Sequence, residues 1–239
     1  MTLNRKRIVV LGGSSGIGLA VAQAAAKEGA SLVIASSNRA RIDAALKTIP
    51  SAAQGHAVDL SSEAAIAALF ASVGAFDHLV YTAGENLSLA KLDALDLDWA
   101  RGFFGVRYWG ALAAAKHGAP HIRPGGSITL TSGSAGQRPQ AGWSVAASIC
   151  SAMQGLTRAL AVELAPLRVN VVAPGVVESP LWDAMPEAER RALFDHMAEA
   201  LPLKHVGTPD EIAQSYLYAM KQTYGTGQSI TVDGGGVLV

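Results

Sequence analysis

The segment Gly12-Gly13-Ser14-Ser15-Gly16-Ile17-Gly18 decides the fold class, because it joins the apolar run Ile8–Leu11 to an alanine-rich stretch with helical spacing. Glycines at a strand-to-helix junction let the backbone approach a ligand, and the N–H groups of the first helical turn can face a phosphate. The spacing differs from the commoner Gly-x-Gly-x-x-Gly pattern, and a purely structural turn would also use glycines. Its place between a strand and a helix favours phosphate binding.

Outward from this loop, short runs rich in β-branched residues alternate with longer alanine-rich stretches. We expect strands at Ile8–Leu11, Ser31–Ala35, His56–Val58, His78–Thr82, Ser127–Thr131, Arg168–Ala173 and Ser229–Val232. Strand–helix alternation predicts an α/β protein with a three-layer, doubly wound (Rossmann) parallel sheet of about seven strands and helices on both faces. Ligands of such folds bind at the carboxyl ends of the strands.

The composition suggests one domain over residues 1–239, because an α/β sheet protein of this length commonly forms a single core. Lys plus Arg and Asp plus Glu each total 19, so a nucleic acid or an anionic membrane is not an expected partner. The lone Cys150 cannot form an internal disulfide, which favours the cytoplasm. No run approaches the roughly 20 apolar residues of a membrane span, so we expect a soluble protein.

One shift in composition interrupts the alternation, at about 178–204. Pro180, Pro186 and Pro202 punctuate a charged segment with helical spacing that follows the sixth strand. We interpret this segment as a lid-like insertion. After it, Thr208-Pro209-Asp210-Glu211 predicts a helix start with a capping box.

The end of the second strand indicates which dinucleotide binds. An NAD site carries an acidic residue about 20 residues after the glycine loop, for the ribose 2′-hydroxyl. Here the sequence reads Ser36, Ser37, Asn38, Arg39, three small polar side chains beside a guanidinium that suit a 2′-phosphate. NADP(H) is therefore favoured over NAD(H). The alternative is that Asn38 caps the next helix and that Arg39 and Arg41 are solvated, roles that are compatible with phosphate contact.

At this point the chain resembles the short-chain dehydrogenase/reductase family from Ile8 to Gly235. Besides the glycine loop, the matching segments are Asp59-Leu60, the weakened motif Tyr81-Thr82-Ala83-Gly84, Arg168–Gly175 and Gly227–Gly235. The resemblance implies the fold, a nicotinamide cofactor, contact of the carboxamide with the Val177 backbone, and Ser179 in place of a threonine. The expected cofactor-binding residues are Gly12, Ser14, Ser15, Gly16, Ile17, Gly18, Ser36, Ser37, Asn38, Arg39, Asp59, Leu60, Ala83, Gly84, Pro174, Gly175, Val177 and Ser179.

The catalytic residues implied by the resemblance are replaced. Counting back from Gly155–Leu164, Ala146 stands in the position of the family's tyrosine acid/base and Cys150 in that of its lysine. Gly133 takes the position of the serine and Arg107 that of the asparagine. No Tyr-x-x-x-Lys occurs anywhere in the chain. Alanine cannot donate a proton, so ketone reduction by the usual relay is excluded.

Three residues are candidates for a catalytic role. Arg107 has a long cationic side chain, whereas Ala146 and Cys150 are smaller than the tyrosine and lysine that the resemblance implies. Arg107 can therefore hold the ribose or polarise a carbonyl. The alternative is that its side chain covers apolar surface. Ser132 and Ser134 can bind a carbonyl oxygen, or merely end the strand with polar groups. Trp143, Trp182 and Met185 would line an apolar pocket or pack in the core.

These features predict an NADP(H)-dependent oxidoreductase with a degenerate catalytic tetrad, acting on a small carbonyl or alcohol-type substrate. Two alternatives stay open, an inactive NADP(H)-binding sensor or assembly protein and an enzyme that uses the dinucleotide differently. We find no metal-ligand spacing. By the resemblance we expect a homodimer or homotetramer.

Overall fold

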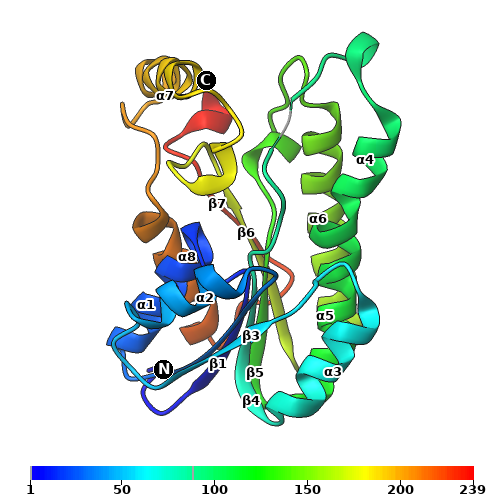
Figure 1. Cartoon of the computed structure of the whole chain (residues 1–239), viewed down its shortest axis with the longest axis vertical. Helices are drawn as coiled ribbons and strands as arrows, with labels where there is room; N and C mark the ends of the chain where they lie inside the picture. The colour runs from blue at the N-terminus through cyan, green and yellow to red at the C-terminus, as the bar shows by residue number, and fades with distance from the viewer. Residues whose placement is uncertain (1, 88) are drawn as a thin grey trace.

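The fold is built on one parallel sheet. The computed structural model describes residues 2–87 and 89–239 and places the strands in the order β3-β2-β1-β4-β5-β6-β7 (Figure 1). The strands are β1 (Arg7–Leu11), β2 (Ser31–Ser36), β3 (Ala53–Ala57), β4 (Phe76–Tyr81), β5 (Ile122–Thr131), β6 (Arg168–Pro174) and β7 (Ser229–Val232). The predicted seven-stranded Rossmann fold is confirmed.

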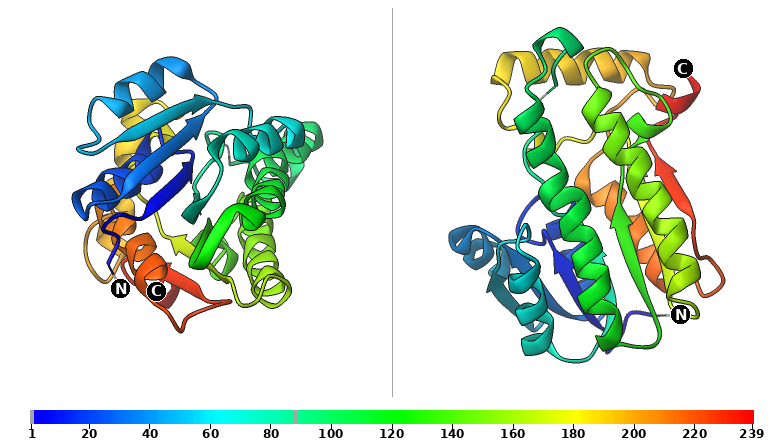
Figure 2. Two further views of the ribbon diagram at one scale, coloured as in Figure 1. Left: turned by 90° about the horizontal axis from the view of Figure 1, so that it is seen from below. Right: turned by 90° about the vertical axis from the view of Figure 1, so that its right-hand side faces the viewer.

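Helices cover both faces of this sheet, as Figures 1 and 2 show. One face packs against α1 (Gly16–Lys27), α2 (Arg39–Leu46) and α8 (Pro209–Lys221), and the other against α3 (Glu63–Val73), α5 (Ala111–Gly118) and α6 (Ser144–Glu163). Each face therefore has its own apolar core. Strands β4 and β6 are buried along their whole length, which is the pattern expected of central strands in a parallel sheet.

Two more helices lie near the carboxyl edge of the sheet, α4 (Leu97–Phe104) and α7 (Glu187–Ala200). Short helical turns complete the chain at Leu92–Ala94, Gly105–Gly110, Ala119–His121, Ser134–Gly136, Pro180–Trp182 and Gly236–Leu238. In Figure 1, α7 and α4 stand at the same end of the molecule, on opposite sides of it. The C-terminus lies close to α7 at this end.

Helix α6 has the length and composition of a membrane span, with 20 residues and a mean hydropathy of 1.3 over its most apolar window. It nevertheless packs on the sheet through Ile149, Met153 and Leu156, which belong to the core. Its apolar side chains thus contribute to the core.

The predicted strands agree with the observed ones in place but differ in their bounds. Strand β3 begins at Ala53, three residues before the predicted start at His56. The sequence pattern missed these residues because an edge strand is partly exposed and has only a weak apolar pattern. Gly55 in this strand admits helix α2, since a Cβ there would lie 2.3 Å from Cγ2 of Ile42. The expected capping box at Thr208 and Glu211 is present at the start of α8.

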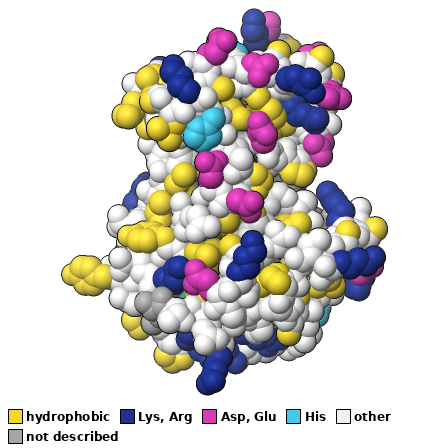
Figure 3. All heavy atoms as spheres, turned by 90° about the vertical axis from the view of Figure 1, so that its left-hand side faces the viewer, with side chains coloured by type: hydrophobic (Ala, Val, Ile, Leu, Met, Phe, Trp, Pro, Cys, Tyr) yellow, Lys and Arg dark blue, Asp and Glu magenta, His cyan; other side chains and the backbone are white. Residues whose placement is uncertain are grey.

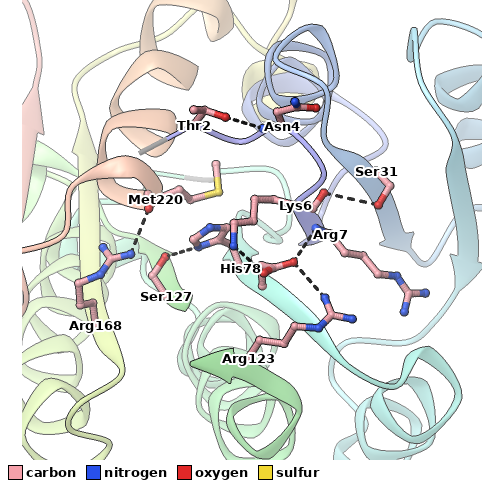
Figure 4. Close-up of polar contacts among 11 residues, drawn as sticks. Thr2, Asn4, Lys6, Arg7, Ser31, His78, Arg123, Ser127, Arg168 and Met220 are labelled. Atoms are coloured by element: carbon pink, nitrogen blue, oxygen red, sulfur yellow. Dashed lines mark hydrogen bonds and ion pairs between the residues drawn. The ribbon is translucent and has the colours of Figure 1, made fainter. Parts of the chain in front are cut away.

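At the amino ends of the strands, Asp77 joins three segments. Its partners Lys6, Arg7 and Arg123 are labelled in Figure 4. Its carboxylate accepts hydrogen bonds from Lys6 Nζ (3.0 Å), the Arg7 backbone N–H (2.8 Å) and Arg123 Nη1 (3.0 Å). Beside it, His78 Nδ1 lies 2.9 Å from the Ser127 hydroxyl. These contacts hold β1, β4 and the start of β5 together, away from the ligand-binding edge.

The outer surface carries both signs of charge. On the face shown in Figure 3, acidic and basic side chains are interspersed, in keeping with a formal net charge of +0. Recognition of a ligand therefore depends on local groups in the site.

We predict that His78 makes stability depend on pH. Burial, aided by the charge of Arg168, lowers the pKa of His78 to about 4 from 6.5. The unfolded chain then takes up a proton before the folded one, so stability falls as the pH drops from 6.5 towards 4, by roughly 3 kcal/mol. In His78→Gln, urea unfolding measured across this range should show a correspondingly smaller loss.

His205→Gln provides a control of opposite sign. The Leu203 carbonyl and Glu211 raise the pKa of His205, so its contribution is present at low pH and is lost as the pH rises. The stability gap between His205→Gln and the wild type should widen on acidification. Identical pH profiles for wild type and His78→Gln would contradict the assignment.

Candidate functional site

A large pocket opens at the carboxyl edge of the sheet, with a volume of about 610 Å³. It is lined by the glycine loop after β1, the ends of β2, β4, β5 and β6, the Gly105–Gly110 turn, helix α6 and the segment that follows β6. Elements far apart in the sequence thus converge where ligands bind in doubly wound sheets.

The glycine loop forms one end of this pocket. Gly12 has φ +90°, and a Cβ on it would lie 2.6 Å from the Ala83 nitrogen at the end of β4. A Cβ on Gly18 would lie 2.3 Å from the Gly12 carbonyl oxygen. Only glycine fits at both positions, so backbone lies against backbone where α1 begins. Gly12, Ser14, Ser15, Gly16, Ile17 and Gly18 all line the pocket, as predicted for a phosphate cradle.

The end of β2 departs in part from the expectation. Ser36 and Ser37 line the pocket, but Asn38 and Arg39 do not. The Asn38 side chain caps α2 by accepting from the Arg41 backbone N–H at 2.9 Å. Arg39 instead pairs with Asp43 at 2.8 Å. Near the end of β2 it is Arg41, and not Arg39, that lines the pocket. The sequence analysis did not select Arg41 as a cofactor-binding residue.

Asp59 and Leu60, which the resemblance places among the cofactor-binding residues, also line the pocket, beside Val58. The Asp59 carboxylate accepts hydrogen bonds from the Ser61 hydroxyl and N–H, and these lower its pKa. Asp59 therefore carries its charge at neutral pH.

The remaining expected cofactor residues line the same pocket. Ala83, Gly84, Pro174, Gly175, Val177 and Ser179 line the pocket. A Cβ on Gly175 would lie 2.8 Å from Cα of Asp233, so the chain after β6 passes close to the C-terminal loop. Val177 pairs with Gly207 as an isolated bridge, and its carbonyl accepts from the Trp182 indole at 3.1 Å.

Arg107 enters the pocket from a π-helical turn, Gly105–Gly110, between α4 and α5. The Tyr81 hydroxyl donates to the Val106 carbonyl of this turn, a contact that competes with the regular helix ladder. Gly110 accommodates the crossing, because a Cβ there would lie 2.4 Å from the Tyr81 hydroxyl. π-Turns of this kind are frequent at functional sites. The sequence carried no period or motif that would predict the turn.

The guanidinium of Arg107 is fixed by its neighbours. Its Cζ lies 4.4 Å from the ring centre of Phe103, Nη2 donates to the Glu85 carbonyl, and Nε lies 3.7 Å from the Glu85 carboxylate. A Cβ on Gly84 would lie 2.5 Å from Cζ. Glycine at position 84 therefore admits the arginine, and Phe103 stabilises its charge.

Ser132, Ser134, Ala146 and Cys150 share this end of the pocket. The Ser132 hydroxyl donates to the Cys150 carbonyl at 2.8 Å, so its proton is already engaged. Burial raises the pKa of the Cys150 thiol, although the Arg107 charge, the Ser132 hydroxyl and the Gly136 N–H act in the opposite direction. Cys150 is thus a buried thiol rather than a thiolate nucleophile.

Apolar side chains cover the pocket around these groups. Trp143 and Trp182 line it, as expected, together with Met197 and Leu201 of the segment after β6. Met185, which the sequence analysis grouped with Trp182, does not line it. Met197 on α7 and Leu201 just after it follow the helical spacing of this segment, which the sequence analysis did not extend to the pocket.

The described lining residues include no tyrosine, histidine or lysine. The chain has five tyrosines, and Tyr81, the nearest to Arg107, is buried with its hydroxyl bonded to Val106. Burial raises the pKa of Tyr81 well above its usual value. It is therefore a structural group and a poor proton donor.

This fold and pocket define a dinucleotide-binding α/β protein, and comparison with known proteins gives the family. Residues 2–239 match the family model of the SDR-like Rossmann domain. The short-chain dehydrogenase/reductase ucsE of Acremonium sp is 35% identical over 255 residues, which cover 99% of this chain and 97% of that protein. The chain belongs to the short-chain dehydrogenase/reductase family of oxidoreductases.

Solved structures agree with this assignment. A small-chain dehydrogenase in complex with NADPH is 35% identical, with a TM-score of 0.85, and the match covers 99% of this chain and 100% of that one. The MalC reductase/Diels-Alderase from Malbranchea aurantiaca is 30% identical, with a TM-score of 0.90, covering 99% and 98% of the two chains.

Gly18→Ala tests the cradle. The added methyl group would overlap the Gly12 carbonyl, and such overpacking costs about 1–3 kcal/mol. NADPH affinity, measured by fluorescence titration, should therefore fall roughly tenfold or more. The control is Gly155→Ala in α6, where a Cβ would meet nothing within 4 Å. An unchanged affinity in Gly18→Ala, with the fold intact by circular dichroism, would be inconsistent with phosphate binding at this loop.

Proposed function

We propose that this protein is an NADP(H)-dependent oxidoreductase that transfers a hydride to or from a small carbonyl or alcohol-type substrate. The observation that carries the proposal is a single pocket that joins the glycine cradle at the start of α1 to Arg107, Ser132 and Ala146. When bound, the nicotinamide supplies or takes the hydride. The chain's own residues hold both partners and exclude water from the space between them.

The pocket lining supports the phosphorylated cofactor. Ser36, Ser37 and Arg41 offer two hydroxyls and a guanidinium at the expected position of the ribose 2′-phosphate, and no acidic side chain follows β2 to repel it. The structural relative in complex with NADPH is consistent with this preference. Asn38 contributes through the cap of α2, which holds Arg41 in place.

The proposed site works without the family's proton relay. We assign Ala146 to the position of the tyrosine, Cys150 to that of the lysine, Gly133 to that of the serine and Arg107 to that of the asparagine. The absence of tyrosine and lysine from the described lining residues supports this assignment. Arg107 is then the cationic group nearest the reacting atoms, and Ser134 is a hydroxyl available to a substrate oxygen.

Ser132 acts as a positioning residue in this proposal. Its hydroxyl donates to Cys150 and thereby holds α6 against the end of β5. A substrate oxygen would have to receive its hydrogen bonds from Arg107 or Ser134 instead.

We further propose that residues 1–239 form a single domain and that the segment at about 178–204 is its lid. Three observations support the lid. Trp182, Met197 and Leu201 line the pocket, Pro180 lies next to Gly16 of the cradle, and the Leu87 backbone N–H donates to the Leu181 carbonyl at 3.1 Å. Closure of this segment over the nicotinamide end would keep water out.

The oligomer and the compartment are proposals as well. Val162 on α6 is 81% exposed and Trp109 is 60% exposed, which favours burial of this face in a homodimer or homotetramer. The single Cys150 favours the cytoplasm.

A nucleotide-binding protein without turnover is the second candidate. It is favoured by the engaged Ser132 hydroxyl and by the lack of tyrosine among the described lining residues. NADPH oxidation followed over a panel of carbonyl, enone, quinone and imine acceptors separates the two. Turnover with any acceptor supports the oxidoreductase, whereas tight NADPH binding without turnover on any of them supports the sensor.

Arg41→Ala should change cofactor preference. Removing a charged hydrogen bond to the 2′-phosphate weakens NADPH binding roughly tenfold and leaves the weaker NADH binding unchanged. Arg39→Ala is the matched control, because Arg39 is engaged with Asp43 outside the pocket. The reverse pattern, with loss of affinity in Arg39→Ala alone, would contradict the assignment.

A further inference from the structure

The charge at the nicotinamide end of the pocket restricts which substrates the site can serve. Arg107 is held there by Phe103, Gly84 and Glu85, and its buried Nε has no hydrogen-bond partner within residues 2–87 and 89–239. Its side chain is 22% exposed, so it keeps a path to the pocket while being largely shielded from water. A guanidinium in such surroundings acts on nearby groups more strongly than one in solvent.

The positive charge of Arg107 acts on other groups in the site. Burial raises the pKa of the Cys150 thiol, whereas the charge of Arg107 acts in the direction that favours its anion. Cys150 lies one helical turn from Ala146, in the wall that faces a substrate. The Glu85 carboxylate lies 3.7 Å from Nε, so Arg107 favours a substrate anion on the side of the guanidinium that faces away from Glu85.

Three hydroxyl groups around this region already make hydrogen bonds within the protein, which leaves Ser134 as the hydroxyl open to a substrate. The Ser132 hydroxyl donates to Cys150, the Thr131 hydroxyl lies 2.6 Å from the Tyr81 carbonyl, and the Tyr81 hydroxyl donates to Val106. A saturated ketone that accepts a hydride becomes an alkoxide, a strong base that needs a proton at once. A conjugated carbonyl becomes a delocalised enolate or phenolate, which a positive charge can hold until water protonates it.

The same pocket has an apolar and aromatic part beside its polar lining. Leu87, Trp143, Ile149, Leu181 and Trp182 belong to this part. Walls of this kind bury flat apolar ring systems and orient them by stacking. A conjugated ring ketone has both features, a flat apolar body and one oxygen for Arg107.

We propose that the substrates are apolar conjugated carbonyl compounds, enones or quinones, whose oxygen binds Arg107. This inference rests on the oxidoreductase function proposed above. The carbon conjugated to the carbonyl gains a hydride, one proton with two electrons, as the C–H bond of the reduced nicotinamide breaks. The C=C electron pair forms the C=C bond of an enolate while the C=O π pair moves to the oxygen, which becomes an oxyanion beside Arg107. Water then supplies one proton and leaves as hydroxide. An enone gives the saturated ketone, a quinone gives a dihydroquinone that tautomerises to the hydroquinone, and the cofactor is left oxidised.

Steady-state rates with three classes of acceptor test the substrate class. The conjugated class comprises 2-cyclohexenone and 1,4-naphthoquinone, the saturated class is cyclohexanone, and the cationic class is an N-methyl dihydroisoquinolinium ion. We expect NADPH oxidation with the first class alone. Arg107→Gln should lower kcat/KM for it by about 10²-fold, the effect of removing one oxyanion donor, while NADPH affinity stays within about twofold. Arg107→Lys should restore part of the rate.

Arg101→Gln is the matched control, since Arg101 pairs with Asp98 on the exposed surface of the neighbouring helix. A higher rate with cyclohexanone or with the cation, or an Arg107→Gln enzyme as fast as the wild type, would overturn the inference and leave the oxidoreductase function standing. No oxidation with any acceptor would instead defeat the proposed function.

A binding measurement, which does not require catalysis, tests the role of Arg107. 4-Nitrophenol is an analogue of the oxyanion, and its absorbance reports its ionisation. Bound to the protein with NADP⁺, its pKa should fall by about one unit or more in the wild type and in Arg101→Gln, but not in Arg107→Gln. Equal values in wild type and Arg107→Gln would show that Arg107 does not hold an anion.

Discussion

The site depends on a contact between two stretches of backbone. The loop after β1 crosses the end of β4 so closely that Gly12 and Gly18 leave no room for a Cβ. This approach aligns the start of α1 with the carboxyl edge of the sheet, so the first N–H groups of the helix face the pocket. Every other site element is placed relative to that edge, including the end of β5 and the turn that carries Arg107.

Much of this arrangement was predictable from the sequence, because the glycine loop and the alternating runs report backbone geometry directly. The alternation of strands with helices and the loop at the end of β1 follow from local patterns. The end of β2 was less predictable. Asn38 is both a small polar residue suited to a phosphate and a good helix cap, and the cap is what the structure shows. Once Asn38 caps α2, Arg41 lines the pocket and Arg39 turns to Asp43.

The π-turn of Arg107 was beyond the reach of sequence patterns. It arises from a long-range contact of the Tyr81 hydroxyl with Val106 and from the absence of a side chain at Gly110, positions that are far apart in the chain. Neither residue is unusual in its own segment. The absence of a Tyr-x-x-x-Lys motif was visible in the sequence, but the position of Arg107 was clear only from its packing against Gly84 and Phe103.

The proposed chemistry follows from what the pocket retains. The residues expected to hold a dinucleotide line the pocket, and in the proposed site Arg107 stands in place of the acid of the family's reaction. A site of this kind favours reactions whose product is a stabilised anion. Such a reaction needs no acidic side chain in the site to protonate the product at once.

The most direct test is a crystal structure of the protein with NADP⁺ and 4-nitrophenolate. The account predicts that the 2′-phosphate contacts Arg41, that the nicotinamide lies beside Ala146, and that the phenolate oxygen is within hydrogen-bond distance of Arg107. A phenolate oxygen bound by other groups, with Arg107 turned away from the nicotinamide, would contradict it.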